Sequence, residues 1–126
     1  MDYLVDSSAW IEYFAGSKEG EEVSKLLKKG EIFTLNLIIS EVVSKIKRMG
    51  MDFNSAYRVI LSNSKILDIN PEIAREAGIL HAEMKKNREN FGLVDAIIII
   101  SIRKIKANLI TLDTHFKGFK EAVLIK

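Results

Sequence analysis

Residues 1–14 have the sequence MDYLVDSSAWIEYF, in which the apolar run Tyr3-Leu4-Val5 ends abruptly at Asp6. The residues after the aspartate show helical periodicity, so this stretch predicts a short buried strand that passes directly into a helix. A carboxylate at the end of a buried strand is costly unless a helix N-terminus, a basic side chain or a metal ion meets it. The partner of Asp6 is therefore the first question that the sequence raises.

Short apolar runs of this kind recur along the chain and alternate with longer segments of helical periodicity. The predicted strands cover residues 2–6, 31–35, 65–69, 108–112 and 122–125, and the predicted helices cover residues 7–15, 18–29, 37–49, 54–62, 71–87 and 94–106. Strands that alternate with helices indicate a parallel sheet flanked by helices. Ligands of such sheets bind at the carboxyl ends of the strands, which makes the residues at strand ends the first candidates for a functional site.

Two residues with special backbone properties support these helix bounds. Gly30 is expected to cap the helix over residues 18–29 at its C-terminus, and Pro71 suits the first position of a helix. The helix over residues 94–106 is apolar nearly all round. That composition predicts burial between layers or at an oligomer interface.

Composition narrows the class of protein. A chain of 126 residues, 48% hydrophobic and 29% charged, is expected to form one globular domain over residues 1–126. The formal net charge of +2 is too small to indicate nucleic-acid binding by bulk charge, and the absence of cysteine excludes disulfides and thiolate chemistry. The longest apolar stretch, residues 96–100, is far shorter than the roughly 20 residues of a membrane helix. We expect a soluble, cytoplasmic protein without a signal peptide or membrane contact.

Four acidic residues stand in apolar surroundings. Asp6 ends the first predicted strand, and Asp113 ends the fourth. Asp95 lies at the head of the most hydrophobic helix, and Glu41 lies just outside the edge of the apolar arc of the helix over residues 37–49. All four carboxylates could converge on one edge of the sheet.

Each acid also has a purely structural interpretation. Asp6 and Asp95 could be helix N-caps, a role that favours aspartate by roughly 1 kcal/mol. Glu41 could pair with Lys45 one helical turn later, and Asp113 could open a turn. Taken singly, these interpretations are at least as good as a catalytic role.

The joint placement favours a metal site instead. Like charges brought together raise each other's pKa values unless a divalent cation lies among them. Oxygen-rich acidic sites suit Mg²⁺ or Mn²⁺, and such ions can activate a water for in-line attack on a phosphodiester. From spacing alone, this is a hypothesis.

Four stretches resemble, in order, the four motifs of the PIN-domain family, most closely its small stand-alone VapC-type toxins. They are LVDSSAWIEYF (4–14), NLIISEVVSKI (36–46), GLVDAIIIIS (92–101) and NLITLDTHFKGF (108–119). The family pattern is an Asp followed by a small hydroxyl residue, a Ser-Glu pair, an Asp-Ala pair and a Thr-x-Asp-x-x-Phe motif. The matching positions are Asp6 with Ser7 and Ser8, Ser40-Glu41, Asp95-Ala96, and Thr111, Asp113 and Phe116.

The resemblance implies a three-layer α/β/α sandwich with a central parallel sheet. The implied activity is an Mg²⁺- or Mn²⁺-dependent endoribonuclease that hydrolyses RNA phosphodiesters, with a metal-activated water as nucleophile. The implied biological role is the toxin of a type II toxin–antitoxin pair. The expected partners are an RNA substrate, a cognate antitoxin protein and a second copy of the chain in a homodimer.

The resemblance also assigns roles to individual residues. The principal metal would be held by Asp6, Glu41 and Asp95. Asp113 would complete the acidic pocket through a second metal or a water, and Ser8 or Thr111 would orient a carboxylate or a metal-bound water. Ser7 and Ser8 are then the residues expected to cap the following helix, which would leave Asp6 free for the metal.

Basic residues and histidine carry weaker signals. Lys85, Lys86 and Arg88 cluster before the Asp95 motif and could contact an RNA backbone, although a lysine-rich helix end is usually only solvated. His115 could approach a scissile phosphate, but a loop histidine without a catalytic role is the simpler interpretation.

Two other functions compete with the ribonuclease. A receiver-type signalling module is also a parallel α/β domain with acids at strand ends, and Asp68 would be its phosphoacceptor. However, Asp6 is followed by serines rather than by a second acid. The remaining alternative is a PIN fold kept only as a non-catalytic binding module.

Overall fold

A five-stranded parallel sheet forms the centre of the molecule. The computed structural model describes residues 1–126. The strands are β1 (Tyr3–Val5), β2 (Ile32–Leu35), β3 (Lys65–Leu67), β4 (Asn108–Thr111) and β5 (Ala122–Leu124), in the order β3-β2-β1-β4-β5. Every neighbouring pair is parallel. The predicted number and direction of the strands are confirmed.

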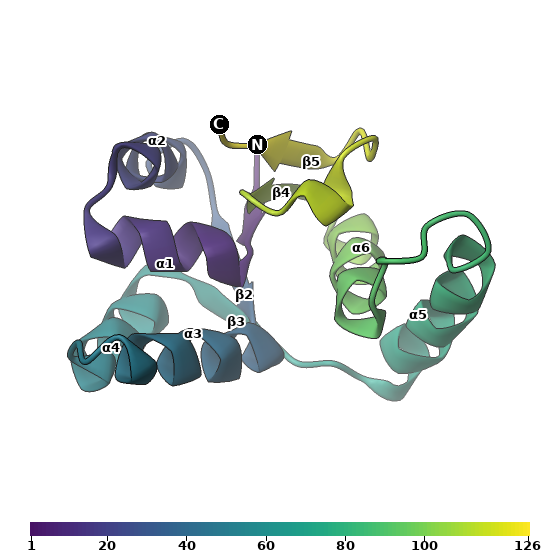
Figure 1. Cartoon of the computed structure of the whole chain (residues 1–126), viewed down its shortest axis with the longest axis horizontal. Coiled ribbons are helices and arrows are strands. Elements are labelled where there is room, and N and C mark those ends of the chain that lie inside the picture. The colour runs from purple at the N-terminus through teal and green to yellow at the C-terminus, as the bar shows by residue number, and fades with distance from the viewer.

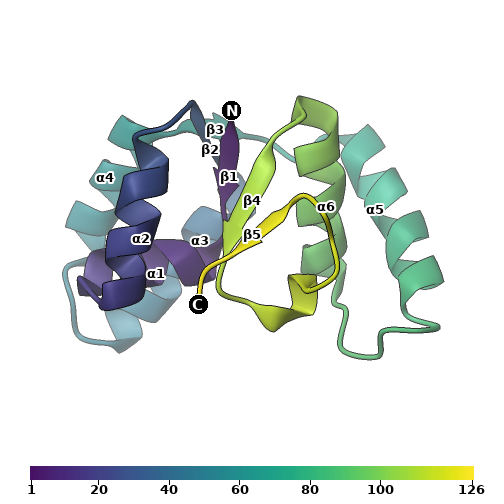
Figure 2. The ribbon, with the colours of Figure 1, turned by 90° about the horizontal axis from the view of Figure 1, so that it is seen from above.

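Helices cover both faces of the sheet. They are α1 (Ser7–Ala15), α2 (Lys18–Leu27), α3 (Asn36–Arg48), α4 (Phe53–Asn63), α5 (Pro71–Met84) and α6 (Leu93–Ile105), followed by the short 3₁₀ helix η1 (Thr114–Phe116). Figures 1 and 2 show α1–α4 on one side of the sheet and α5 and α6 on the other. This is the predicted three-layer α/β/α sandwich.

The strand order reverses between β1 and β4. The chain builds β1, β2 and β3 in one direction, and then returns on the opposite face through α5 and α6 to place β4 on the other side of β1. Val5 pairs with Ile110, so the next residues, Asp6 and Thr111, follow side by side at the carboxyl ends of the two strands. A crevice for a ligand is expected at this switch point.

Buried apolar side chains of β1, β4 and α6 pack together and hold the two strands at the switch point in position. Leu4 and Val5 of β1, and Leu109 and Ile110 of β4, are fully buried. Helix α6 lies between the sheet and α5 (Figure 2), so its Ile-rich surface is buried between layers, the first of the two predicted alternatives. None of the helices combines the length and apolar character needed to cross a bilayer.

Gly30 does not have the predicted capping role. Helix α2 ends at Leu27, and Lys28 is the C-cap residue. A Cβ atom on Gly30 would lie 1.5 Å from the carbonyl oxygen of Met1, so glycine is needed here for close backbone approach at the start of the sheet. Pro71, in contrast, begins α5 as predicted.

Candidate active site

Asp6 joins β1 to α1 and is itself the N-cap of α1. Its backbone is extended, and its Oδ1 accepts the Ser7 backbone N–H at 2.8 Å. Ser7 and Ser8 are the first two residues of the helix, so the expectation that they cap it and leave Asp6 free is wrong. The physical reason is that only Asp6 has the extended backbone that turns a side chain back to the first amide. Asp6 is only 4% exposed.

Two hydroxyl groups complete the surroundings of the buried Asp6 carboxylate. Thr111 Oγ1 donates to Asp6 Oδ2 at 2.7 Å, and Ser8 Oγ donates to the same oxygen at 3.2 Å. The two hydroxyls also accept backbone N–H groups: Ser8 that of Leu112 at 3.0 Å, and Thr111 that of Asp113 at 2.9 Å. Burial raises the pKa of Asp6, and the Thr111 hydroxyl is the strongest of the hydrogen bonds that oppose this rise.

Asp95 approaches from the opposite layer. It is the third residue of α6, and its Oδ2 accepts the backbone N–H of Gly92, the N-cap residue, at 2.8 Å. Asp95 is thus not the N-cap that one sequence interpretation allowed, but it satisfies an amide at the same helix end. The first turn of α6 holds this carboxylate at 9% exposure.

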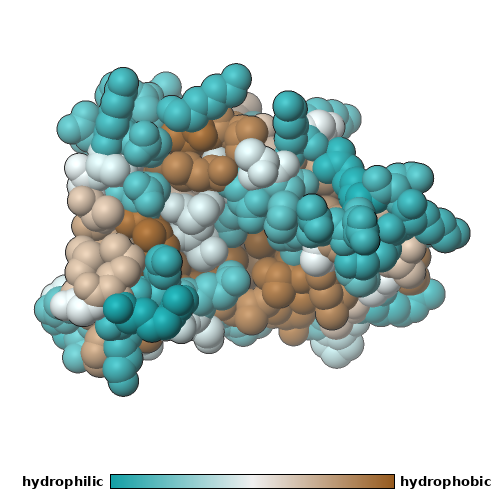
Figure 3. Space-filling model, viewed as in Figure 1, coloured by the Kyte–Doolittle hydropathy of each residue, from teal (hydrophilic) through white to brown (hydrophobic).

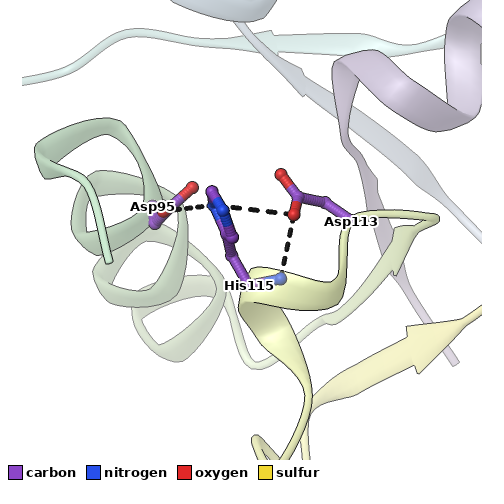
Figure 4. A group of neighbouring side chains, drawn as sticks. All are labelled: Asp95, Asp113 and His115. Atoms are coloured by element: carbon purple, nitrogen blue, oxygen red, sulfur yellow. Dashed lines mark hydrogen bonds and ion pairs between the residues drawn. The ribbon is translucent and has the colours of Figure 1, made fainter. Parts of the chain in front are cut away.

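Asp113 and His115 belong to the tight turn after β4. Asp113 is the N-cap of η1, and its Oδ1 accepts the His115 backbone N–H at 2.9 Å. Figure 4 shows the imidazole between two carboxylates, with Nδ1 at 3.2 Å from Asp95 Oδ2 and 3.5 Å from Asp113 Oδ1. Potential ligand atoms of these three residues all lie within 4.8 Å of one another.

His115 is the residue that the sequence undervalued. The available signal was its spacing, because a side chain two residues after a strand-end aspartate shares the same tight turn. What the sequence did not show was the contact with Asp95, which is 20 residues away in the chain and meets the imidazole through tertiary packing.

Glu41 is close enough to the other three predicted carboxylates for their charges to act on it. It lies on the exposed side of α3. It makes no ion pair with Lys45, so the ion pair that the sequence allowed as its structural role is absent. Partial burial of the carboxyl group raises the pKa of Glu41, and the charges of Asp6, Asp95 and Asp113 raise it further. Four acids from α3, α6 and the ends of β1 and β4 therefore share one electrostatic environment, which we call the acidic cluster.

A pocket of about 330 Å³ adjoins the acidic cluster. Its lining includes Ser7 and Ser8 of α1, Glu41 of α3 and Leu112 after β4. Ser7 and Ser8 follow the carboxyl end of β1 and Leu112 follows that of β4, so the pocket and the cluster lie at the carboxyl edge of the sheet. The face seen in Figure 3 is hydrophilic over α3, whereas apolar surface gathers over one end of α6.

Two of the three basic residues before α6 have contacts within the protein. Lys85 donates to the Glu89 carbonyl at 2.6 Å. Arg88 donates to the His115 carbonyl at 3.2 Å and lies over the Phe119 ring, 4.7 Å from its centroid, so it connects the loop before α6 to η1. Lys86 is exposed. Of the three, only Arg88 reaches a residue of the candidate site.

A family comparison agrees with this arrangement. The PIN domain family model matches residues 3–122. The chain belongs to the PIN domain family. The match includes β1 to β4, the first residue of β5 and all four acids of the cluster. No curated protein sequence is similar enough to the chain to count as a match.

Solved structures give the same fold. A chain of a toxin–antitoxin complex from Klebsiella pneumoniae is 26% identical, with a TM-score of 0.76 over 96% of this chain and 95% of that one. VapC20 from Mycobacterium tuberculosis, a toxin that cleaves the sarcin–ricin loop, is 19% identical, with a TM-score of 0.77 over 94% and 97%. DNA-bound VapBC from Salmonella typhimurium is 14% identical, with a TM-score of 0.73 over 98% and 96%.

The position of Asp68 argues against a receiver-type signalling module, in which this residue would be the phosphoacceptor. Asp68 follows β3, the edge strand, which is separated from β1 by β2. Two strand spacings amount to about 10 Å, and the Asp68 carboxylate accepts a hydrogen bond from Asn36 at 3.2 Å instead of joining the acidic cluster.

Proposed function

We propose that this PIN-domain chain is a divalent-metal-dependent endoribonuclease and the toxin of a toxin–antitoxin pair. The observation that carries the proposal is the acidic cluster at the β1/β4 switch point, where burial and then the charges of three neighbouring carboxylates raise the pKa of Glu41. Mutually repelling acids are costly to the apo fold, and a cation placed among them removes that cost. The family match and the similarity to VapC toxins support the same function.

The donor set fits Mg²⁺ or Mn²⁺. Asp6, Glu41, Asp95 and Asp113 supply carboxylate oxygens, the ligands that both ions prefer. Asp6 Oδ1 accepts a single hydrogen bond and so has a lone pair to spare, despite its burial. We propose that these four acids hold the metal. When bound, such an ion supplies charge neutralisation and an activated water for in-line attack on a phosphodiester.

Other side chains hold the acids in place. The Thr111 and Ser8 hydroxyls fix the orientation of the Asp6 carboxylate and oppose the rise in its pKa that burial causes. Oriented ligands of this kind bind metal without a reorganisation cost. The His115 imidazole lies between Asp95 and Asp113, within 3.5 Å of a carboxylate oxygen of each.

The test is cleavage of bacterial RNA in Mg²⁺ or Mn²⁺ by the wild type, by Asp6→Asn and by Asp95→Asn. We expect at least a hundredfold loss of rate in each variant, because each loses a charge that the metal needs. Asp68→Asn makes the same chemical change at an exposed strand end outside the cluster, and it should cleave at the wild-type rate. Equal activity of all four proteins would refute the ribonuclease.

Metal titration by calorimetry separates the enzyme from a non-catalytic binding module. An enzyme of the proposed class binds Mn²⁺ in the wild type and loses that binding in Asp95→Asn. A PIN fold that serves only as a binding module would show no binding in either protein.

The toxin role and the homodimer are separate parts of the proposal. The toxin role predicts growth arrest on expression, relieved by Asp95→Asn. The exposed side chains of Ile79 and Leu93, 46% and 51% accessible, provide apolar surface for a second copy. Sedimentation equilibrium should give twice the monomer mass, and Leu93→Glu should lower it if this surface forms the contact.

A further inference from the structure

The pocket beside the acidic cluster has a second, basic part. Lys45 and Arg48 of α3 line it together with Glu41. They follow Glu41 by four and seven residues, a spacing that places all three on one side of the helix. With a rise of 1.5 Å per residue, the cations lie about 6 Å and about 10 Å farther along α3 than the carboxylate.

Neither cation has an acidic partner. Lys45 and Arg48 form no ion pair within 4.0 Å and no side-chain hydrogen bond, although the pocket also contains Glu12 of α1. Both side chains are exposed, so packing does not require them. Two carboxylates and two cations thus line one pocket of about 330 Å³, and neutralising Glu41 with a metal would leave it net positive.

We propose that Lys45 and Arg48 form a phosphate-binding subsite, which holds the RNA backbone beside the phosphodiester placed at the acidic cluster. This inference rests on the proposed ribonuclease function. An acidic cluster repels a polyanionic substrate, so a strand that crosses it needs cations on at least one side. Lys45 and Arg48 line one pocket with Glu41 of the cluster and have no partner, whereas Lys85 donates to the Glu89 carbonyl and Arg88 to the His115 carbonyl.

Single-stranded RNA fits this subsite better than an acidic peptide. The two cations are separated by about one helical turn along α3, which suits the regularly spaced phosphates of a backbone. Arg48 offers a planar, bidentate donor group, and Lys45 a point charge, the two usual partners of phosphate oxygens. Contacts to phosphate position a strand without reading its sequence, so these two residues are positioning residues and not catalytic ones.

The test measures RNA binding in the Asp95→Asn background, which removes cleavage. The probe is a fluorescein-labelled single-stranded RNA of mixed sequence, followed by fluorescence anisotropy over a range of salt concentrations. Adding Lys45→Ala and Arg48→Ala should weaken binding by roughly tenfold or more. The slope of log affinity against log salt should become less steep by about 1.4, since each phosphate contact to a single strand accounts for about 0.7.

Two further variants make the result specific. Lys28→Ala with Lys29→Ala removes the same charge at the opposite edge of the sheet, between α2 and β2, and should change neither affinity nor slope. Lys45→Arg with Arg48→Lys keeps both charges and should retain most of the salt slope. Melting temperatures should stay at the parental value throughout, because none of these side chains is buried.

Three outcomes would overturn the subsite. They are unchanged RNA affinity after the Lys45 and Arg48 substitutions, an equal loss in the Lys28 and Lys29 control, and, when labelled polyglutamate replaces the RNA as the anisotropy probe, loss of polyglutamate binding without loss of RNA binding. Failure of the ribonuclease is distinguishable, since it appears as absence of cleavage by the wild type whatever the binding data. In the wild-type background, the substitutions should raise the half-saturating protein concentration in single-turnover cleavage more than they lower the maximal rate.

Discussion

Replacing Thr111 with valine should destabilise the protein in a pH-dependent way. Thr111→Val keeps the shape of the fully buried side chain and removes only its hydroxyl. That hydroxyl donates to Asp6 Oδ2 at 2.7 Å and accepts the Asp113 backbone N–H at 2.9 Å. The substitution therefore removes one charge-assisted hydrogen bond and leaves one backbone donor without its partner.

The magnitude follows from these two contacts. A hydrogen bond to a charged group contributes about 1.5–3 kcal/mol, and an unsatisfied donor costs about 1 kcal/mol where water can partly reach it. We expect a loss of about 2.5–4 kcal/mol at pH 7 in the presence of a chelator. For a chain of this length, this corresponds to a fall in Tm of roughly 10–16 °C.

The sign of the pH dependence comes from Asp6. Burial raises its pKa in the folded state, so the stability contributed by this carboxyl group falls as pH rises through the raised value. The Thr111 hydroxyl opposes that rise, so its removal raises the pKa of Asp6 further. Most of the deficit of Thr111→Val should therefore disappear at acidic pH, where Asp6 is protonated with or without the hydroxyl.

The assay is urea unfolding at pH 7 and at the lowest pH where the wild type remains folded. Thr34→Val is the matched control, because Thr34 is equally buried in β2 and its hydroxyl bonds only neutral groups, Trp10 Nε1 at 3.1 Å and Ser64 Oγ at 2.9 Å. Its deficit should be the same at both pH values. A pH-independent deficit for Thr111→Val, or one below about 0.5 kcal/mol, would refute the reasoning.

Three further predictions test other parts of the structure. Mn²⁺ at a hundred times its Kd should stabilise the wild type by about 2.7 kcal/mol and leave the Tm of Asp95→Asn unchanged in a thermal scan. Glu41→Gln should raise the stability of the apo-protein at pH 7 by no more than ~1 kcal/mol, the value of an exposed charge pair, because burial and the neighbouring acids raise the pKa of Glu41. Urea unfolding should show that this gain disappears at acidic pH, where Glu41 is protonated. Gly30→Ala should lower the free energy of unfolding by more than about 2 kcal/mol, since its Cβ would lie 1.5 Å from the Met1 carbonyl oxygen. Gly78→Ala is the control, because Gly78 has open space in the middle of α5, and it should raise the free energy of unfolding by about 0.5–1 kcal/mol. If Gly30→Ala proved no less stable than Gly78→Ala, the structure would be contradicted.

Most of the fold could be predicted because its signals are local. All five strands and six helices lie where apolar runs and helical periodicity placed them, with bounds that differ by a few residues. The errors fall at helix ends, as at Gly30, where the conformation depends on contacts with distant backbone. The short helix η1 was not predicted, because three residues carry no periodicity.

Only part of the candidate site could be predicted from the sequence. Asp6 and Asp113 could be placed at one sheet edge by strand ends alone, and the structure gathers all four acids in one environment. The capping roles were misassigned, because Asp6 and Ser7 are equally good cap residues by type and only the backbone turn after β1 selects between them. The same limit applies to Glu41, whose local partner Lys45 is four residues away but unpaired.

The sequence by itself determined the elements, the parallel sheet and the identity of the acids, because hydrophobic period and residue type act over a few neighbouring positions. Only the tertiary structure decided what each side chain meets. His115 lies between two carboxylates because α6 brings Asp95 across from the other layer, 20 residues earlier in the chain. The position of Lys45 and Arg48 in a pocket beside the acids depends likewise on how α3 packs against α1. Such contacts follow from the packing of layers, which no short stretch of sequence encodes.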